Sequence, residues 1–195
     1  MTERTKTAIV WGVVAGATAV SVALWPVAID FAGHGDVGKA IQVSIGWGFV
    51  IGGALALRRR PGNRIGAAMI ATGVAWWLGS MLGTRVPILW TIALMSNSAY
   101  FPFLVFTFLA FPIGRLGWWL PRLAVGLAAT AEIVGYVIAN LFSDPRASGC
   151  TDCQPGLNVL LIEHKPELAT FLNFRVALSS AMAALAVTLG LLVIR

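Results

Sequence analysis

The sequence predicts an all-α polytopic membrane protein whose chain crosses the bilayer as six transmembrane helices. The first observation is composition: 58% of the 195 residues are hydrophobic and 11% are charged, whereas soluble domains carry about 25% charged residues. The second is that the apolar residues form long continuous runs, and roughly 20 such residues cross the hydrocarbon core as a helix. Because lipid offers the backbone no hydrogen bonds, these continuous runs must be helical.

The third observation is that the charged residues lie mostly in short segments between the apolar runs. The net charge of +6 therefore reflects loops that orient the helices in the bilayer. On this basis the chain is expected to have the lipid bilayer, and no nucleic acid, as a partner.

The six expected spans belong to one domain that covers residues 1–195. The first apolar run follows Arg4 and Lys6, as in a signal peptide, but it is longer than the core of roughly 7–15 residues that such peptides have. We therefore expect it to remain as a helix. The spans are 8–29, 40–57, 65–82, 87–111, 123–142 and 168–194.

A basic turn, "RRRPGNR", joins the second and third spans. Pro61, Gly62 and Asn63 are residue types that reverse the chain. The arginines are expected to lie among anionic lipid headgroups and so to anchor the topology. The anchor residues are Arg58, Arg59, Arg60 and Arg64.

Proline residues mark the limits of the later spans. Pro102 is expected to kink the fourth span, and Pro112 to end it. An outer loop, 143–165, follows the fifth span, and Pro166 can occupy the first helical position after it. The sixth span, 168–194, would be about 40 Å long. Since this exceeds a hydrocarbon core of about 30 Å, the helix is expected to tilt or to project into the cytoplasm.

The distribution of basic residues predicts that both ends of the chain are cytoplasmic. Six spans place both ends on one side, together with the second–third and fourth–fifth loops, and that side carries nine Lys and Arg residues against four on the other. The side richer in Lys and Arg is normally the cytoplasmic one. The nine are Arg4, Lys6, Arg58, Arg59, Arg60, Arg64, Arg115, Arg122 and Arg195; the four are Lys39, Arg85, Arg146 and Lys165.

Four polar residues inside the spans form a candidate cluster: Asn97, Glu132, Tyr136 and Arg175. Glu132 and Arg175 are expected at similar depth, and intramembrane charges normally face the bundle interior in pairs. One interpretation is a structural ion pair that joins the fifth and sixth spans. The other is a polar cavity that receives a small hydrophobic or amphipathic ligand.

The outer loop contains a Cys-x-x-Cys pair, Cys150 and Cys153. An oxidising exterior favours a disulfide, and a redox-active thiol pair and a metal site are the alternatives. Gln154 stands where haem attachment would need histidine, and structural zinc usually requires four ligands. We therefore assign no metal and no cofactor to this loop.

Two short motifs carry a family resemblance. "RRRPGNRIG" after the second span and "FPIGRL" after the fourth resemble stretches in the membrane-embedded N-terminal region of actinobacterial sensor histidine kinases. Arg64 stands where that family often has proline, and Ile113 where it often has aspartate. The resemblance implies a sensory input module in the plasma (inner) membrane that passes a stimulus through the sixth span to a kinase part.

The chain itself carries no catalytic residues for such a reaction. Its two histidines, His34 and His164, fall in outer loops, and no glycine-rich phosphate loop follows a strand. We expect either a fragment of a longer kinase or a free-standing membrane module. The alternative function is a small self-contained transporter or membrane accessory protein that uses the Glu132/Arg175 pair.

Glycine spacing leaves the oligomeric state open. GxxxG patterns, which allow close helix approach, occur at Gly12/Gly16, Gly48/Gly52 and Gly79/Gly83. We expect them to pack helices within one chain, with a homodimer face as the alternative.

Overall fold

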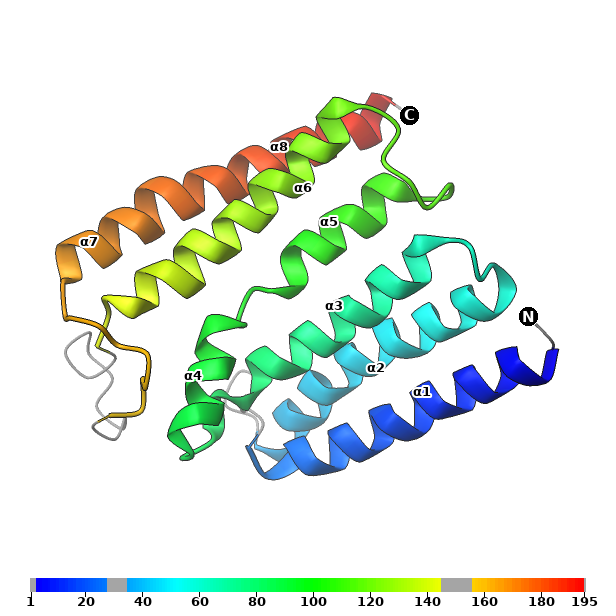
Figure 1. Ribbon diagram of the computed structural model, residues 1–195, viewed down its shortest axis with the longest axis horizontal. Coiled ribbons are helices and arrows are strands. Elements are labelled where there is room, and N and C mark those ends of the chain that lie inside the picture. The colour runs from blue at the N-terminus through cyan, green and yellow to red at the C-terminus, as the bar shows by residue number, and fades with distance from the viewer. Residues whose placement is uncertain (1–2, 28–34, 145–155, 195) are drawn as a thin grey trace.

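A computed structural model describes residues 3–27, 35–144 and 156–194, and within these ranges all regular structure is helical. Two π-helical segments, Ile133–Ile138 and Phe171–Ala177, continue α6 and join α7 to α8 (Figure 1). The helices are α1 (Glu3–Leu24), α2 (Asp36–Arg59), α3 (Arg64–Ser80), α4 (Pro87–Met95), α5 (Tyr100–Ala110), α6 (Trp119–Glu132), α7 (Pro166–Thr170) and α8 (Leu178–Ile194).

Neighbouring helices in the sequence are neighbours in space. Helix α1 packs on α2, α2 on α3, α3 on α5, α5 on α6, and α6 on α8. Figure 1 shows these helices running back and forth along the bundle, with the N and C marks at the same end as the turn between α2 and α3. Consecutive helices are usually adjacent in space, and here this holds for α6 and α8 as well, although the outer loop 143–165 separates their segments.

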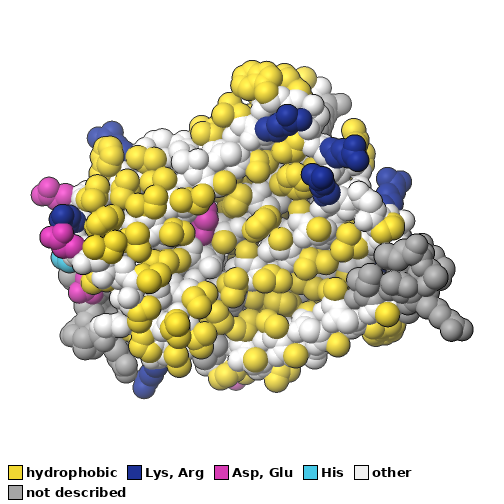
Figure 2. Space-filling model, in the orientation of Figure 1, with side chains coloured by type: hydrophobic (Ala, Val, Ile, Leu, Met, Phe, Trp, Pro, Cys, Tyr) yellow, Lys and Arg dark blue, Asp and Glu magenta, His cyan; other side chains and the backbone are white. Residues whose placement is uncertain are grey.

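Five helical segments are long and apolar enough to cross a membrane, by length and composition. The apolar part of α1, Trp11–Leu24, is shorter than these five. The side of the bundle is largely hydrophobic, with several Lys and Arg side chains toward one end, and most acidic side chains together with other Lys and Arg toward the opposite end (Figure 2). The chain is therefore an all-α polytopic membrane protein. The five segments are Asp36–Arg59, Arg64–Gly83, Pro87–Ala110, Trp119–Leu141 and Pro166–Ile194.

Two glycine pairs bring the backbones of α2 and α3 together. A Cβ added to Gly53 would lie 2.6 Å from the Gly66 carbonyl oxygen, and one added to Gly73 would lie 2.6 Å from that of Gly46. Since lipid tails are as apolar as the side chains, close packing of small residues is what holds such helices together. The two glycines that do this in each helix lie seven residues apart, and those of α2 are not the Gly48/Gly52 pair.

Two tryptophans extend this interface by hydrogen bonds. The indole N–H groups of Trp76 and Trp77 donate to the carbonyl oxygens of Gln42 and Val43, at 2.9 and 3.1 Å. Both acceptors lie in α2, whose i→i−4 bonds already use these carbonyls once. The indoles thereby set the rotation of α3 against α2.

The expected fourth span is the one that departs most from its prediction. It consists of two helices, α4 and α5, separated by turns at residues 96–99. The kink was predicted at Pro102, which instead lies inside the first turn of α5. Proline has no N–H to donate to residue 98, and the preceding backbone turns there, where the Phe101 N–H donates to Ser98 O.

The other expected spans agree to within a few residues at the ends that the structure describes. The second, third, fifth and sixth begin earlier than predicted, at Asp36, Arg64, Trp119 and Pro166. Pro166 occupies the start of its helix, as predicted. Helix α1 ends at Leu24 and a 3-10 turn follows to Val27, so the predicted limit of 29 lies outside the described residues.

The outer loop packs on the bundle through its described part, residues 156–165. The Thr91 hydroxyl donates to Leu157 O at 2.9 Å and accepts from the Val159 N–H at 3.0 Å. The buried Asn158 donates from Nδ2 to Asn140 O at 2.7 Å. The segment thus contacts α4 and the end of the α6 segment through its polar groups, while the side chains of Val159, Leu160 and Ile162 are exposed.

Candidate ligand cavity

A cavity of about 410 Å³ lies between the α4–α5 break, the middle of the Trp119–Leu141 segment and the last helical segment, Pro166–Ile194. This volume falls within the range of about 300–1,000 Å³ that small-molecule sites have. Its lining residues are Ser98, Tyr100, Phe101, Ala131, Glu132, Tyr136, Asn173, Phe174, Ala177, Leu178 and Ala181.

The α4–α5 break forms one wall of the cavity. Gly79 of α3 allows the break to pack closely, since a Cβ there would lie 3.0 Å from Asn97 Cα. The Trp76 ring packs edge-on against the Tyr100 ring, with a centroid distance of 4.9 Å, at the start of α5. In a straight helix the side chains of residues 96–101 would point in other directions, so the break determines which of them line the cavity.

The two π-helical segments form the facing wall and pack on each other. A Cβ added to Gly135 would lie 2.7 Å from the Ala177 Cβ and 3.1 Å from Asn173 Oδ1. A π turn inserts one extra residue and rotates the side chains that follow it, and such turns occur frequently at functional sites. Here one lies directly after Glu132, and the other carries Asn173, Phe174 and Ala177 into the cavity.

Glu132 is the one acidic residue among those lining the cavity. Its side chain is 8% exposed, and neither carboxylate oxygen has a hydrogen-bond partner among the described residues. Burying a carboxylate without a partner is costly, and intramembrane carboxylates normally face a partner or a cavity. Glu132 therefore lines the cavity while both of its acceptor oxygens are buried without a partner among the described residues.

The structure brings together only half of the predicted polar cluster. Glu132 and Tyr136 line the cavity, whereas Asn97 lies in the break against Gly79 and does not line it. Arg175 is exposed. The predicted Glu132–Arg175 ion pair is therefore wrong, because helical rise gives depth alone and the π turn at Phe171–Ala177 sets the direction in which Arg175 lies.

Most of the residues that line the cavity were not predicted from the sequence. Tyr100, Phe101, Asn173 and Phe174 were not predicted as site residues, although all four line the cavity. The stretch "MSNSAY" could have indicated the wall formed by the α4–α5 break, since a run of polar residues inside an apolar span indicates that the helix is interrupted there. Nothing in the sequence marks Asn173 and Phe174, whose placement follows from the π turn.

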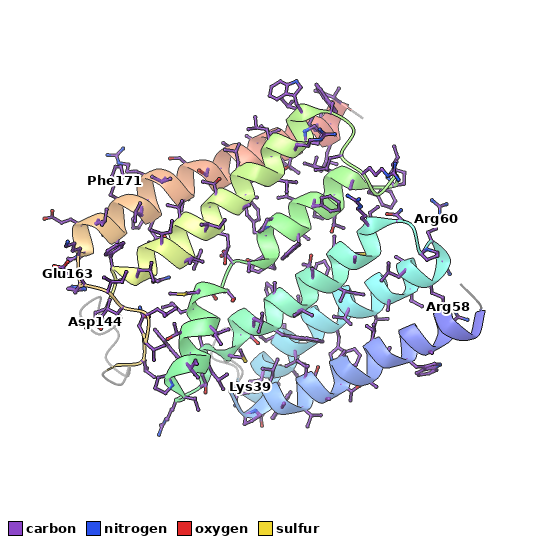
Figure 3. The ribbon with its side chains drawn as sticks, in the orientation of Figure 1. Lys39, Arg58, Arg60, Asp144, Glu163 and Phe171 are labelled. Carbon is purple, nitrogen blue, oxygen red and sulfur yellow. The ribbon has the colours of Figure 1, made fainter. Side chains whose placement is uncertain are left out.

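The predicted basic anchor lies at one end of the bundle. Arg58 and Arg60 extend from the α2–α3 turn, and Asp144 and Glu163 lie at the opposite end (Figure 3). Arg59 and Arg64 are exposed in the same turn.

The two motifs that carry the family resemblance contact each other at this end. Asn63 Nδ2 donates to Pro112 O at 3.0 Å, while Asn63 Oδ1 accepts from the Ile65 N–H at 2.9 Å and caps α3. Gly114 has a φ of +79°, a conformation that favours glycine, and a Cβ there would collide with the Asn63 side chain. Gly114 therefore allows the chain to turn closely against Asn63 after α5.

The cysteine pair, Cys150 and Cys153, lies outside the described residues. The part of the outer loop that is described ends in a contact between its two sides, where His164 Nδ1 accepts from the Asp144 N–H at 3.1 Å. Lys165 and Glu163 form an exposed ion pair at 2.7 Å. Such exposed pairs contribute little to stability.

Comparisons with family models, curated proteins and solved structures returned no match to this chain.

Proposed function

We propose that the chain is the transmembrane sensory input module of a two-component sensor histidine kinase. One observation carries the proposal: the cavity beside the unpartnered Glu132 carboxylate takes five of its lining residues from the last helical segment, Pro166–Ile194. A molecule that occupies the cavity must contact this segment. The resemblance of the two turn motifs to sensor kinases supports the same function.

The proposed mechanism is a shift of the last helix between two packings. Its π segment, Phe171–Ala177, packs on the π segment of Ile133–Ile138 with Gly135 against Ala177. Helix shifts of about 1–2 Å at an interface are a common way to transmit a signal. A ligand that binds one packing better than the other displaces α8 along or about its axis, and α8 passes this movement to a kinase part.

Filling the cavity tests the proposal. Ala181→Leu adds volume against the cavity wall and is expected to change histidine phosphorylation in native membranes that contain the protein, as measured with radiolabelled ATP. With spin labels at Trp119 and Val193, both exposed at the same end of the bundle, the same substitution is expected to move α8 by about 1–2 Å.

The matched control is Ala186→Leu, which adds the same volume at an exposed position of α8 outside the cavity. It is expected to leave both readings unchanged. The sensor proposal would be overturned by either of two results. One is histidine phosphorylation that is the same with and without this chain, and the other is an equal movement of α8 in the Ala181→Leu and Ala186→Leu variants.

We further propose six spans, with α1 as the first, in the plasma membrane and with the N- and C-terminal ends cytoplasmic. The opposite ends occupied by Arg60 and Glu163 in Figure 3 support this orientation. In a background with Cys150 and Cys153 replaced by serine, Glu163→Cys is expected to react with an impermeant maleimide on intact cells. Arg60→Cys is expected to react only after permeabilisation; labelling of both residues from one side would exclude the topology.

A transporter is the second candidate, and the α4–α5 break favours it. Secondary transporters form mid-membrane sites from discontinuous helices, and here the break lies beside a buried carboxylate. Uptake of a solute into proteoliposomes that is abolished by Glu132→Gln would support this function over the sensor.

A further inference from the structure

We infer that the cavity binds a lipophilic monocation, an aromatic or short-chain ammonium compound whose charged nitrogen pairs with Glu132. This inference names the chemical class of the stimulus. The role of the ligand as a stimulus rests on the proposed function. The binding itself follows from the charge, polarity and opening of the cavity.

The charge of the ligand follows from the missing partner. Glu132 is 8% exposed and both of its oxygens lack a hydrogen-bond donor among the described residues. None of the described residues that line the cavity is Lys, Arg or His. The intramembrane arginine expected to neutralise the carboxylate, Arg175, is exposed instead. A carboxyl group without an internal counterion is neutralised by a proton or by a bound cation, and an ammonium group supplies the donors that the Glu132 oxygens lack.

The apolar character of the ligand follows from the rest of the wall. Four aromatic side chains, those of Tyr100, Phe101, Tyr136 and Phe174, surround the same space. Aromatic faces attract organic cations, and more strongly where water is excluded. The remaining apolar residues of the wall are aliphatic, Leu178 and three alanines.

The route of entry is lateral. Phe174 and Leu178 on the outer wall are 66% and 51% exposed, and Glu132 lies near the middle of the Trp119–Leu141 segment. The cavity therefore opens on the side of the bundle, toward the acyl chains. A ligand that reaches it must first partition into the bilayer, which excludes strongly hydrated cations.

The test uses the full chain in nanodiscs of uncharged lipid, with two probes matched in shape. 2-Phenylethylammonium carries the cation, and 2-phenylethanol replaces it by a neutral hydroxyl. We expect calorimetric titration to give a dissociation constant at least tenfold lower for the ammonium. Glu132→Gln is expected to abolish this preference, whereas Glu167→Gln, an exposed carboxylate on the same final segment, leaves it intact.

Ala181→Leu provides a second variant, independent of charge. It is expected to weaken binding of the ammonium at least tenfold by occupying the cavity, while Ala186→Leu binds as the parent chain does. Circular dichroism and gel filtration check that each variant is folded. Equal affinity for the two probes, or an ammonium preference that survives Glu132→Gln, would overturn the inference.

The failure of this inference and the failure of the proposed function give different results. Glu132-dependent ammonium binding with no change in the 119–193 spin-label distance supports the ligand assignment and overturns the sensor mechanism. A distance that responds to Ala181→Leu, together with absent ammonium binding, supports the sensor and overturns the ligand assignment.

Discussion

Gly53→Ala is expected to destabilise the protein by about 1–3 kcal/mol, the usual cost of adding a methyl group to a close-packed contact. The new Cβ would lie 2.6 Å from the Gly66 carbonyl oxygen and 2.9 Å from the Ile70 backbone nitrogen. Neither atom belongs to a side chain that could move aside, so α2 and α3 must separate. Separation also lengthens the indole hydrogen bonds of Trp76 and Trp77 to α2.

The measurement is the midpoint of SDS-induced unfolding, followed by circular dichroism. Gly48→Ala is the matched control: it makes the same change in the same helix, at a position where an added Cβ meets nothing within 4 Å. Because alanine favours helix over glycine by about 1 kcal/mol at most, this variant is expected to be neutral or slightly more stable. Equal midpoints for the two variants would show that α2 and α3 do not pack through Gly53.

Gly114→Ala is expected to produce the second large loss, in the turn after α5. A left-handed backbone costs an L-residue about 1–2 kcal/mol, and Gly114 has φ +79°. The new methyl group would also collide with the Asn63 side chain, which caps α3 and donates to Pro112 O. The two loops at this end are expected to separate, with faster proteolysis at both and a lower unfolding midpoint.

Two further substitutions resolve the contributions at this contact. Asn63→Asp keeps the oxygen that caps α3 and removes the donor to Pro112, so it should loosen the loops while preserving the helix start; Asn63→Ala also removes the cap, at a further cost of about 1 kcal/mol. Gly117→Ala, in the same loop with no atom within 4 Å of the added Cβ, is the control. Loop proteolysis that is as fast in Gly117→Ala as in Gly114→Ala would contradict this account.

The acidic residue of the candidate site, Glu132, was predictable from the sequence, whereas most of the other residues that line the cavity were not. A glutamate inside an apolar run marks a functional position from sequence alone, since the charge is costly there, and Glu132 does line the cavity. Its partner could not be predicted. The choice of Arg175 rested on depth along two ideal helices, and the π turn at Phe171–Ala177 changes the rotation of everything that follows it.

The contact between the two basic turns was also beyond the sequence. Each turn was recognisable by its proline and glycine, and Gly114 does adopt the conformation that this glycine permits. That Asn63 joins one turn to the other at Pro112 depends on α3 lying beside α5. No local pattern records which helices become neighbours.

The apolar runs alone determined that this chain is helical, where most helices begin and end, and that it belongs in a membrane, because hydrocarbon length and backbone hydrogen bonding leave an apolar segment little choice. Only the tertiary structure decided which glycines form the α2–α3 contact, where the fourth segment breaks, and that Glu132 faces a cavity instead of an arginine. These depend on the rotation and close approach of whole helices, which hydrophobicity leaves undetermined, since in lipid an apolar face is equally well solvated in any direction.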